Sequence, residues 1–320
     1  MPTVSIIIPS FNVEKFIPST IESALAQTIN DKEIIVIDDG STDNTFEVAR
    51  KYEGINVLVI KQPNSGAAIA RNTGLKYANG KYIQFLDAGD LMDADKIEKQ
   101  IKALNGSDSA VAVSDYIQFS REEEILNATH PDQSAFIYSS NNPIDFLINL
   151  WGGNGQSNFI QTNCWLTPRA LIEKAGYWRS YRCPDDDGEF FSRIILKSSS
   201  VIYTPNIYNY YRIDPSANQL SGNKNKKYLM NTLLTIDLKK KYIMDRGGHP
   251  KVDITFARQY RNFSVYAYPA QKLLSKIADN RYKNHHVNLP PPLLGGKIIE
   301  FINRLFGWKI ARLVRSYFSE

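Results

Sequence analysis

Short apolar runs alternate with helix-like segments through the first 115 residues of the chain. The runs that we predict to be strands are residues 4–8, 33–37, 56–60, 82–86 and 110–113. Between them, apolar residues recur at spacings of three and four, which predicts helices over residues 16–26, 42–52, 67–78 and 93–104. The alternation predicts an α/β fold with a right-handed, mostly parallel sheet flanked by helices.

The pattern becomes less regular after Phe119. Residues 120–142 are polar and include the run Glu122-Glu123-Glu124, so we predict a solvated excursion there. Beyond it, strands are predicted at 164–166, 201–203 and 208–212, and helices at 168–175 and 183–197. A polar segment follows at 214–223, residues 225–285 are predicted to be helical, 288–296 is a linker rich in Pro and Gly, and 297–320 is predicted to be one more helix.

Composition is typical of a globular protein and favours one cellular compartment over others. It has 320 residues, of which 43% are hydrophobic and 22% are charged. Two cysteines are too few for a disulfide framework and favour a reducing compartment. Pro9 interrupts the first apolar run, which argues against a secretory signal, and we expect a cytoplasmic protein. The net charge of +5 is modest and much of it lies in the last hundred residues, so we expect no nucleic-acid partner.

Polar clusters follow successive predicted strands. They are Pro9-Ser10-Phe11-Asn12, Asp38-Asp39-Gly40-Ser41, Asn64-Ser65-Gly66 with Arg71-Asn72, and Asp87 with Asp90. Each alone could be a helix cap, but all should meet at the carboxyl edge of one sheet, where such sheets bind ligands. Their carboxylates can accept hydrogen bonds from a nucleoside or ligate Mg²⁺ or Mn²⁺ beside a diphosphate.

Phosphate binding must then rely on a metal and on side chains. The chain has neither GxxxxGK nor GxGxxG, the glycine-rich loops that hold phosphates through backbone N–H groups. Arg71 is the side-chain candidate, and an ion pair at the edge of the core is its alternative interpretation.

A second acidic cluster, Asp185-Asp186-Asp187-Gly188-Glu189, begins a predicted helix. Acids in a first helical turn complement the helix dipole, which is one interpretation of this cluster. A carboxylate in this position can also act as a general base towards a hydroxyl. The sequence leaves both interpretations open.

The motifs SIIIPSFN, VIDDGSTDNT, NSGAAIARNTG, FLDAGD and DDGEFFSR, in this order, resemble those of family 2 glycosyltransferases with the GT-A fold. The resemblance covers about residues 1–215. It implies an inverting transfer of a sugar from a nucleoside diphosphate donor, usually UDP-linked, to a hydroxyl of a glycan or lipid-linked saccharide, with Mn²⁺ or Mg²⁺. It also implies a domain over 1–222, with a nucleotide-binding half at 1–115 and an acceptor-side half at 116–222, followed by a helical region at 223–320.

The resemblance also assigns roles to residues of this chain. Pro9, Ser10 and Phe11 would line the nucleoside pocket, Asp39 would accept from uracil N3, Arg71 would lie near the nucleotide, Asp87 at the ribose and metal, and Asp90 on the metal. Asp187 would be the base, with Asp186 beside it. Four positions differ from the residues that are frequent in the family: Phe11, Gly89, Gly188 and Asp214. Because Gly89 replaces an acid, the metal assignment moves towards Asp90.

The last predicted helix, 297–320, repeats apolar residues at three and four, with Lys or Arg in much of the remainder. This is the pattern of an interfacial helix, which would associate the protein peripherally with the anionic inner face of a membrane. An amphipathic helix docked on its own domain, or on a second subunit of a homodimer, explains the pattern equally well.

Two other functions remain open from the sequence. A nucleotidyltransferase that makes nucleotide sugars would need a Gly-rich, basic loop after the first strand, and residues 9–15 do not form one. A nucleotide-sugar-binding module without catalysis is disfavoured because Asp90, Asp187 and Arg71 are all present. The missing glycine fingerprint also disfavours an NAD-dependent enzyme.

Overall fold

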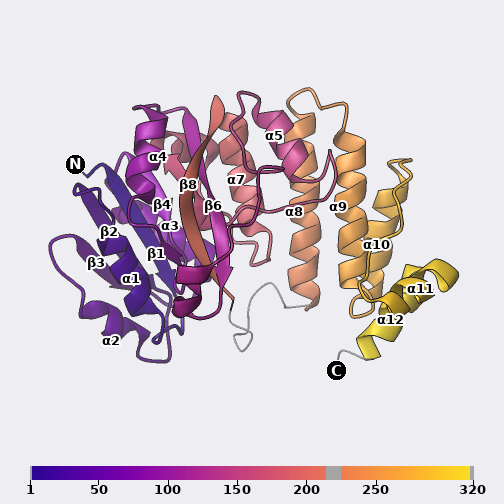
Figure 1. Ribbon diagram of the computed structural model, residues 1–320, viewed down its shortest axis with the longest axis horizontal. Coiled ribbons are helices and arrows are strands. Elements are labelled where there is room, and N and C mark those ends of the chain that lie inside the picture. The colour runs from indigo at the N-terminus through magenta and orange to yellow at the C-terminus, as the bar shows by residue number, and fades with distance from the viewer. Residues whose placement is uncertain (1, 214–224, 318–320) are drawn as a thin grey trace. The chain divides into compact units, whose positions relative to one another are not determined.

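The computed structural model describes residues 2–213 and 225–317 (Figure 1). The segment predicted at 214–223, including Asp214, and the last three residues of the predicted helix 297–320 lie outside the described residues. The chain forms two compact units. The first comprises Met1–Phe146, Ile160–Arg182 and Phe190–Ala217, and the second comprises Leu147–Phe159, Cys183–Glu189 and Asn218–Glu320.

Within the described residues, the strands of the first unit form one sheet in the order β3-β2-β1-β4-β7-β6-β8-β5. The strands are β1 (Val4–Ser10), β2 (Lys32–Asp38), β3 (Val57–Lys61), β4 (Tyr82–Phe85), β5 (Leu91–Met92), β6 (Ala110–Phe119), β7 (Trp165–Pro168) and β8 (Ser200–Arg212). The pairs β1 with β2, β1 with β4, β2 with β3, and β6 with β8 are parallel. The predicted α/β class with a mostly parallel sheet is confirmed.

Helices accompany these strands in the first unit. They are α1 (Ile17–Leu25), α2 (Thr45–Arg50), α3 (Ala67–Tyr77), α4 (Lys96–Leu104), α6 (Arg169–Ala175), the 3-10 helices η1 (Glu122–Asn127) and η2 (Thr162–Cys164), the first half of α5 (Pro143–Leu150) and most of α7 (Asp186–Lys197). The last residues of α5 and the first of α7 belong to the second unit.

The alternation of side chains along β1 explains why helices cover both faces of the sheet. Ile6 and Ile8 are fully buried in a core cluster with residues of α1, α2 and α4. Ile7 points the other way, towards α3, where a Cβ added to Gly74 would lie 2.3 Å from its Cγ2 atom. Helix α3 therefore packs closely on the sheet only because residue 74 has no side chain.

The second unit contains helices over most of its length. They are α8 (Lys226–Met244), α9 (Val252–Ala267), α10 (Lys272–Lys283), α11 (Lys297–Phe306) and α12 (Trp308–Tyr317), and α8, α9 and α10 pack side by side (Figure 1). The prediction of one helix over 297–320 is wrong, because Gly307, with φ of +80°, separates α11 from α12. No helix in the described ranges is long and apolar enough to cross a membrane.

Candidate active site

The nucleoside side of the predicted site lies where β1 ends. Pro9 and Ser10 are buried in the strand, and the Ser10 hydroxyl donates to the Ile37 carbonyl at 3.2 Å. Phe11 follows directly, and its side chain is 45% exposed. The strand therefore ends with an aromatic ring open to a ligand and a backbone held in place by β2.

Asp39 is buried just beyond β2 and holds the turn that begins α3. Its Oδ1 accepts from Gln62 Nε2 at 2.6 Å and from the Ser65 backbone N at 2.9 Å, and its Oδ2 accepts from the Gly66 backbone N at 2.7 Å. Four lone pairs are available on an ionised carboxylate, so one acceptor position remains after these three bonds. The structure thus gives Asp39 a structural function that the sequence did not indicate.

Arg71 on α3 forms an ion pair with the turn that follows β4. Its Nη2 atom lies 2.6 Å from Asp87 Oδ1, and its guanidinium stacks over the Trp178 ring at 4.4 Å from the ring centroid. The side chain is buried, whereas the Asp87 side chain is 36% exposed. The pairing agrees with the alternative interpretation as an edge ion pair, and it also leaves Asp87 accessible to a ligand.

Asp90 is buried in the same turn and is held by residues distant in sequence. Its Oδ2 accepts from Asn163 Nδ2 at 2.5 Å, and its Oδ1 accepts from the Arg212 backbone N at 2.8 Å. The Thr20 hydroxyl donates to the Asp90 carbonyl at 3.0 Å and accepts from the Gly89 backbone N at 2.9 Å. Helix α1 and strand β8 therefore both fix the turn.

Sequence reasoning did not assign functions to Asn163, Thr20 or the backbone of Arg212. Asn163 bridges the two acids, because its Oδ1 also accepts from the Asp87 backbone N at 3.0 Å. Arg212 clamps the turn further, since its Nε donates to the Gly89 carbonyl at 2.8 Å and its Nη2 pairs with Glu122 at 2.6 Å. The one signal in the sequence was a polar residue, Asn163, directly before a predicted apolar strand.

The two acids of this turn are the residues here that could hold a divalent cation. Burial, together with the negative charge of Asp87, raises the pKa of the Asp90 carboxyl well above its usual range, although the bonds from Arg212 and Asn163 act in the opposite direction. A nearby cation would relieve this penalty. Among the described residues, no group of three or more His, Cys, Asp or Glu side chains is placed to hold a metal. Two carboxylates are the number that commonly binds Mg²⁺ together with substrate phosphates.

The second acidic cluster begins α7 and belongs to the second unit. Asp185 is fixed there by α8, because Lys239 Nζ lies 2.7 Å from its Oδ2 and the Thr235 hydroxyl donates to Oδ2 at 2.6 Å. Asp187 Oδ1 accepts from the Gly188 backbone N at 2.7 Å. A Cβ at Gly188 would lie 2.2 Å from Asp185 Oδ1, so residue 188 must be glycine while Asp185 is held by Lys239.

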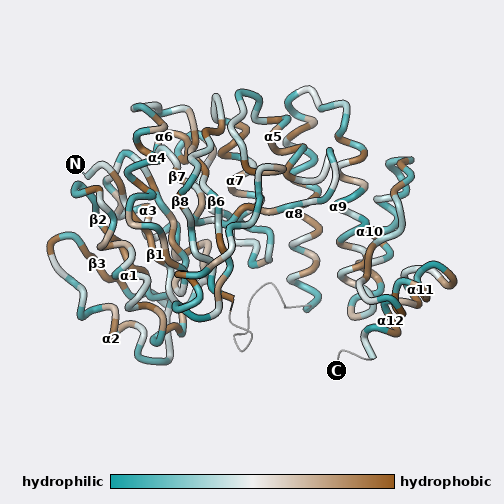
Figure 2. The backbone as a smooth tube through the Cα atoms, in the orientation of Figure 1, coloured by the Kyte–Doolittle hydropathy of each residue, from teal (hydrophilic) through white to brown (hydrophobic). Residues whose placement is uncertain are grey.

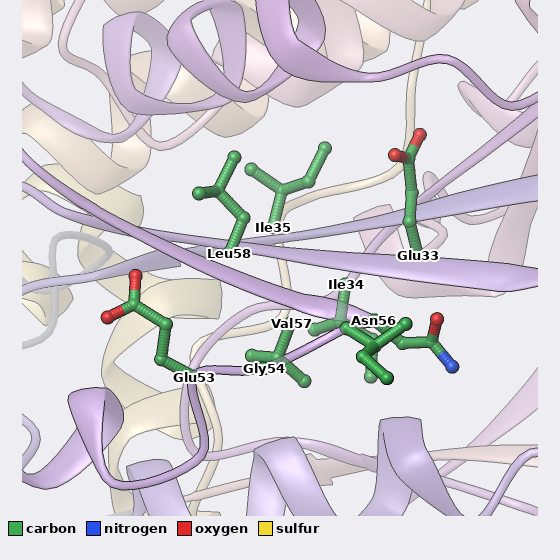
Figure 3. Close-up of a pocket in the computed structure, with 9 residues that line it drawn as sticks. Glu33, Ile34, Ile35, Glu53, Gly54, Asn56, Val57 and Leu58 are labelled. Atoms are coloured by element: carbon green, nitrogen blue, oxygen red, sulfur yellow. The ribbon is translucent and has the colours of Figure 1, made fainter.

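A pocket at the opposite end of β2 does not involve any of these groups (Figure 3). It has a volume of about 430 Å³ and is lined by Glu33, Ile34, Ile35 and residues 53–58. Glu33 lies at the start of β2, whereas Asp38 and Asp39 lie at its end. Its carboxylate also already accepts from the Ser5 hydroxyl at 2.6 Å. The predicted residues therefore do not line this pocket.

Comparison with known proteins gives the family. The model of "Glycosyl transferase family 2" matches residues 5–174. The cholesterol galactosyltransferase of Borreliella burgdorferi is 29% identical over 247 residues, which cover 73% of this chain and 67% of that protein. Glycosyltransferase GlyA of Streptococcus pneumoniae is 28% identical over 216 residues, which cover 66% of this chain but only 30% of that protein.

A shorter match is the UDP-Glc:alpha-D-GlcNAc-diphosphoundecaprenol beta-1,3-glucosyltransferase WfaP of Escherichia coli, 42% identical over 117 residues, or 36% of this chain and 47% of that protein. The match thus spans less than half the length of two of these three relatives.

Solved structures share the fold. Staphylococcus aureus TarS 1-349, in complex with UDP-GlcNAc, has a TM-score of 0.64 at 16% identity, and the match covers 100% of this chain and 92% of that one. The mannosyltransferase PcManGT of Pyrobaculum calidifontis, in complex with GDP-Man and Mn²⁺, has a TM-score of 0.56 at 16% identity, with 100% and 88% covered. These similarities confirm the predicted GT-A fold. Because the family model matches more than half of the chain, the protein belongs to glycosyl transferase family 2.

Proposed function

We propose that the protein is an inverting glycosyltransferase that moves a sugar from a UDP-sugar to a hydroxyl of a glycan or a lipid-linked saccharide. The observation that carries the proposal is the ion pair, 2.6 Å long, between Arg71 of α3 and Asp87 of the turn that also holds the buried Asp90. This turn ends a parallel strand at the edge where such sheets bind nucleotides. Family membership and the nucleotide-sugar complexes of TarS and PcManGT support it.

The nucleoside would bind at the ends of β1 and β2. The exposed ring of Phe11 is available to stack on the base, above the backbone of Pro9 and Ser10. Asp39, with one acceptor position left, would take the N3–H of uracil. Asp87 would accept from the ribose through the part of its side chain that is exposed.

The diphosphate would lie beside Asp87 and Asp90. These two carboxylates would hold Mn²⁺ or Mg²⁺, which when bound supplies positive charge against the leaving UDP. Asn163 and Arg212 keep the Asp90 carboxylate in a single orientation for this purpose. Arg71 adds a fixed cation on the protein side, and its guanidinium is held flat by the Trp178 ring.

Asp187 would be the general base, with Asp186 next to it in the first turn of α7. Its carboxylate takes the proton of the acceptor hydroxyl as the oxygen bonds to the anomeric carbon. The bond from that carbon to the diphosphate breaks on the opposite face, and its electron pair leaves with UDP. A single displacement of this kind inverts the configuration of the sugar.

The names of two relatives support the acceptor that we propose. These are, by name, enzymes acting on cholesterol and on a diphosphoundecaprenol carrier. We propose a lipid-linked saccharide as the acceptor and a function in polysaccharide biosynthesis at the cytoplasmic face of a membrane. In this proposal residues 1–222 form the transferase domain, with a nucleotide half at 1–115 and an acceptor half at 116–222, and residues 223–320 form a helical accessory region.

Thermal unfolding of the full chain with UDP-, GDP- and dTDP-sugars, each with and without Mn²⁺, tests the donor. Ligand at about 100 times its dissociation constant stabilises by about 2.7 kcal/mol, which is readily seen as a shift in Tm. We expect the largest shift with a UDP-sugar and Mn²⁺, and slow Mn²⁺-dependent hydrolysis of that sugar. A shift without hydrolysis or transfer would favour a binding module, and pyrophosphate release from UTP and a sugar phosphate would favour a nucleotidyltransferase.

A further inference from the structure

Helix α11 exposes its apolar side, which is the reverse of an ordinary surface helix. Ile298, Phe301 and Leu305 are spaced by three and four residues, so they lie on one face of the helix. Their side chains are 75%, 62% and 58% exposed. Figure 2 shows hydrophobic segments along both α11 and α12. A soluble surface helix normally turns such a stripe towards the core.

The polar side of α11 is bonded to the linker that precedes the helix. Asn303 is buried and its Nδ2 donates to the Pro292 carbonyl at 2.8 Å. Glu300 Oε1 accepts from the Gly295 backbone N at 2.7 Å. Both bonds are local, within residues 292–303, and they hold Asn303 and Glu300 on the side of the helix next to the linker. Ile298, Phe301 and Leu305 lie on the other side of the helix.

Helix α12 continues the same arrangement after the break at Gly307. Ala311 is fully buried, and Trp308 packs edge-on against Tyr268 at 5.7 Å between ring centroids. Ile310 and Tyr317 are seven residues apart, on one face, and both are exposed. The exposed apolar residues of the two helices, together called the apolar stripe below, are Ile298, Phe301, Leu305, Phe306, Ile310 and Tyr317.

The charge of this segment is strongly positive. Residues 297–317 contain five basic residues, Lys297, Arg304, Lys309, Arg312 and Arg315, and one acidic residue, Glu300. All the basic residues except Arg312 are exposed. Glu300 is turned to backbone N–H groups, as described above. An exposed apolar stripe beside basic side chains is complementary to an anionic membrane, in which apolar acyl chains lie beneath negatively charged headgroups.

We propose that α11 and α12 dock on an anionic lipid membrane, with the apolar stripe in the boundary between headgroups and acyl chains and the basic residues at the headgroups. The structure replaces the predicted single helix with two short ones, of which α11 is bonded to the linker before it and α12 packs against Tyr268 through Trp308. This inference extends the proposed function. Membrane binding itself does not depend on that function, and only the link to a lipid-linked acceptor rests on it.

Sedimentation of the full chain with vesicles tests the proposal, without donor or acceptor present. We expect binding to vesicles of phosphatidylglycerol and phosphatidylcholine in equal parts, weaker binding to phosphatidylcholine alone, and loss with rising salt. Phe301→Ser and Leu305→Ser should each lower the partition coefficient about tenfold, because each removes an apolar side chain that leaves water when the protein binds the membrane. Arg304→Gln and Lys309→Gln should each lower it about fivefold, on anionic vesicles only.

Leu126→Ser provides the control, because Leu126 is even more exposed than the stripe residues but lies in the first unit. Its partition coefficient should equal that of the unchanged protein. Far-UV circular dichroism and Tm confirm that each variant is folded.

The proposal is overturned if the folded full chain stays in the supernatant at low salt, or if the stripe variants bind as the control does. A dimer that Phe301→Ser dissociates, in a chain that does not bind vesicles, would identify the stripe as a subunit interface instead. Because the vesicles carry no sugar donor, a chain that binds them but shows no Tm shift with any nucleotide sugar would contradict the proposed function alone.

Discussion

The Asn163 side chain donates to Asp90 Oδ2 at 2.5 Å across 73 residues of sequence. Its Oδ1 accepts the backbone N–H of Asp87 at 3.0 Å, so one amide fixes the relative position of the two acids. An amide is suited to this position because it offers one donor and one acceptor without adding a third negative charge.

Asn163→Ala should therefore weaken both folding and metal-dependent donor binding. Leaving a buried polar group without its partner costs about 1–3 kcal/mol, and here two groups lose one. We expect a lower free energy of unfolding in urea and a reduced effect of Mn²⁺ on UDP-sugar affinity. Asn30→Ala, at an exposed position, is the control and should change neither. A variant with normal Mn²⁺ dependence would show that Asn163 has only a structural function.

Gly89→Ala should destabilise the protein through its backbone alone. Gly89 has φ of +109°, which residues with a Cβ rarely adopt, yet an added Cβ would meet only Arg212 Cδ, at 3.9 Å. We expect a loss of about 1–3 kcal/mol in urea unfolding, the usual cost of a strained φ, ψ pair. Gly54→Ala, where φ is not positive and the Cβ would meet no atom within 4 Å, should be neutral or slightly stabilising. Equal stabilities of the two variants would contradict this explanation of Gly89.

Asp187→Asn should abolish most turnover and leave donor binding intact. A general base contributes about 10² to 10⁴ in rate, so kcat should fall by that factor. Transfer kinetics measure the loss, and the Tm shift with UDP-sugar measures the binding. Asp245→Asn, which changes an exposed acid of the same unit paired with Lys241 at 2.6 Å, should retain kcat. Near-normal turnover in Asp187→Asn would refute the assignment of the base.

Lys96 should make stability depend on pH in the alkaline range. It is fully buried, and its Nζ donates to Gln84 Oε1 at 2.8 Å and to Gln100 Oε1 at 2.9 Å, both uncharged. Burial lowers the pKa of Lys96 from 10.5 to about 7, although Cys164 and Asp93 favour its charged form. Below about pH 7 Lys96 is protonated in both the folded and the unfolded chain. Burial of its charge then lowers the free energy of unfolding by its full amount.

Between pH 7, near the pKa of Lys96 in the folded protein, and pH 10.5, its ordinary pKa, the unfolded chain binds more protons at this lysine than the folded chain does. The free energy of unfolding therefore rises with pH in this range. The slope contributed by Lys96 is at most about 1.4 kcal/mol per pH unit. Lys96→Met should remove it, whereas Lys102→Met, which changes an exposed lysine of the same helix, should not. Urea unfolding at several values above pH 7 measures the slopes, and parallel curves for Lys96→Met and the unchanged protein would refute the assignment.

The predictable part of the fold was the part encoded locally. The strands β1 to β4 and the helices between them carry their own apolar periodicity, so their positions followed from the sequence. Strand β8 was predicted as two strands because Pro205 interrupts its pattern, but a register shift between Val113 and Asp115 of β6 lets the pairing continue past it. Strand β5 has only two residues, too few for any periodicity. The predicted start of the helix at 93–104 was also wrong, since the Asp93 side chain accepts from the Tyr208 backbone N at 2.8 Å and the helix, α4, begins at Lys96.

The same distinction applies to the candidate site. The strand ends placed Ser10, Asp39, Asp87 and Asp90 on one edge, because that placement depends only on where each strand stops. What holds these residues could not be predicted: Asp39 bonds to the turn at 65–66 and Asp90 bonds to β8, and neither partner carries a local signal. The roles of Asp186 and Asp187 remain predictions.

The stacking around Trp178 gives the protein an optical reporter of its own. The indole is sandwiched between Arg71, 4.4 Å from its ring, and Phe190, whose ring is stacked on it at 4.0 Å. Indole emission is sensitive to an adjacent charge, and Arg71 is the cation expected to respond when a diphosphate arrives. Fluorescence of Trp178, isolated by replacing the other three tryptophans with Phe, would then follow donor binding in real time without any label.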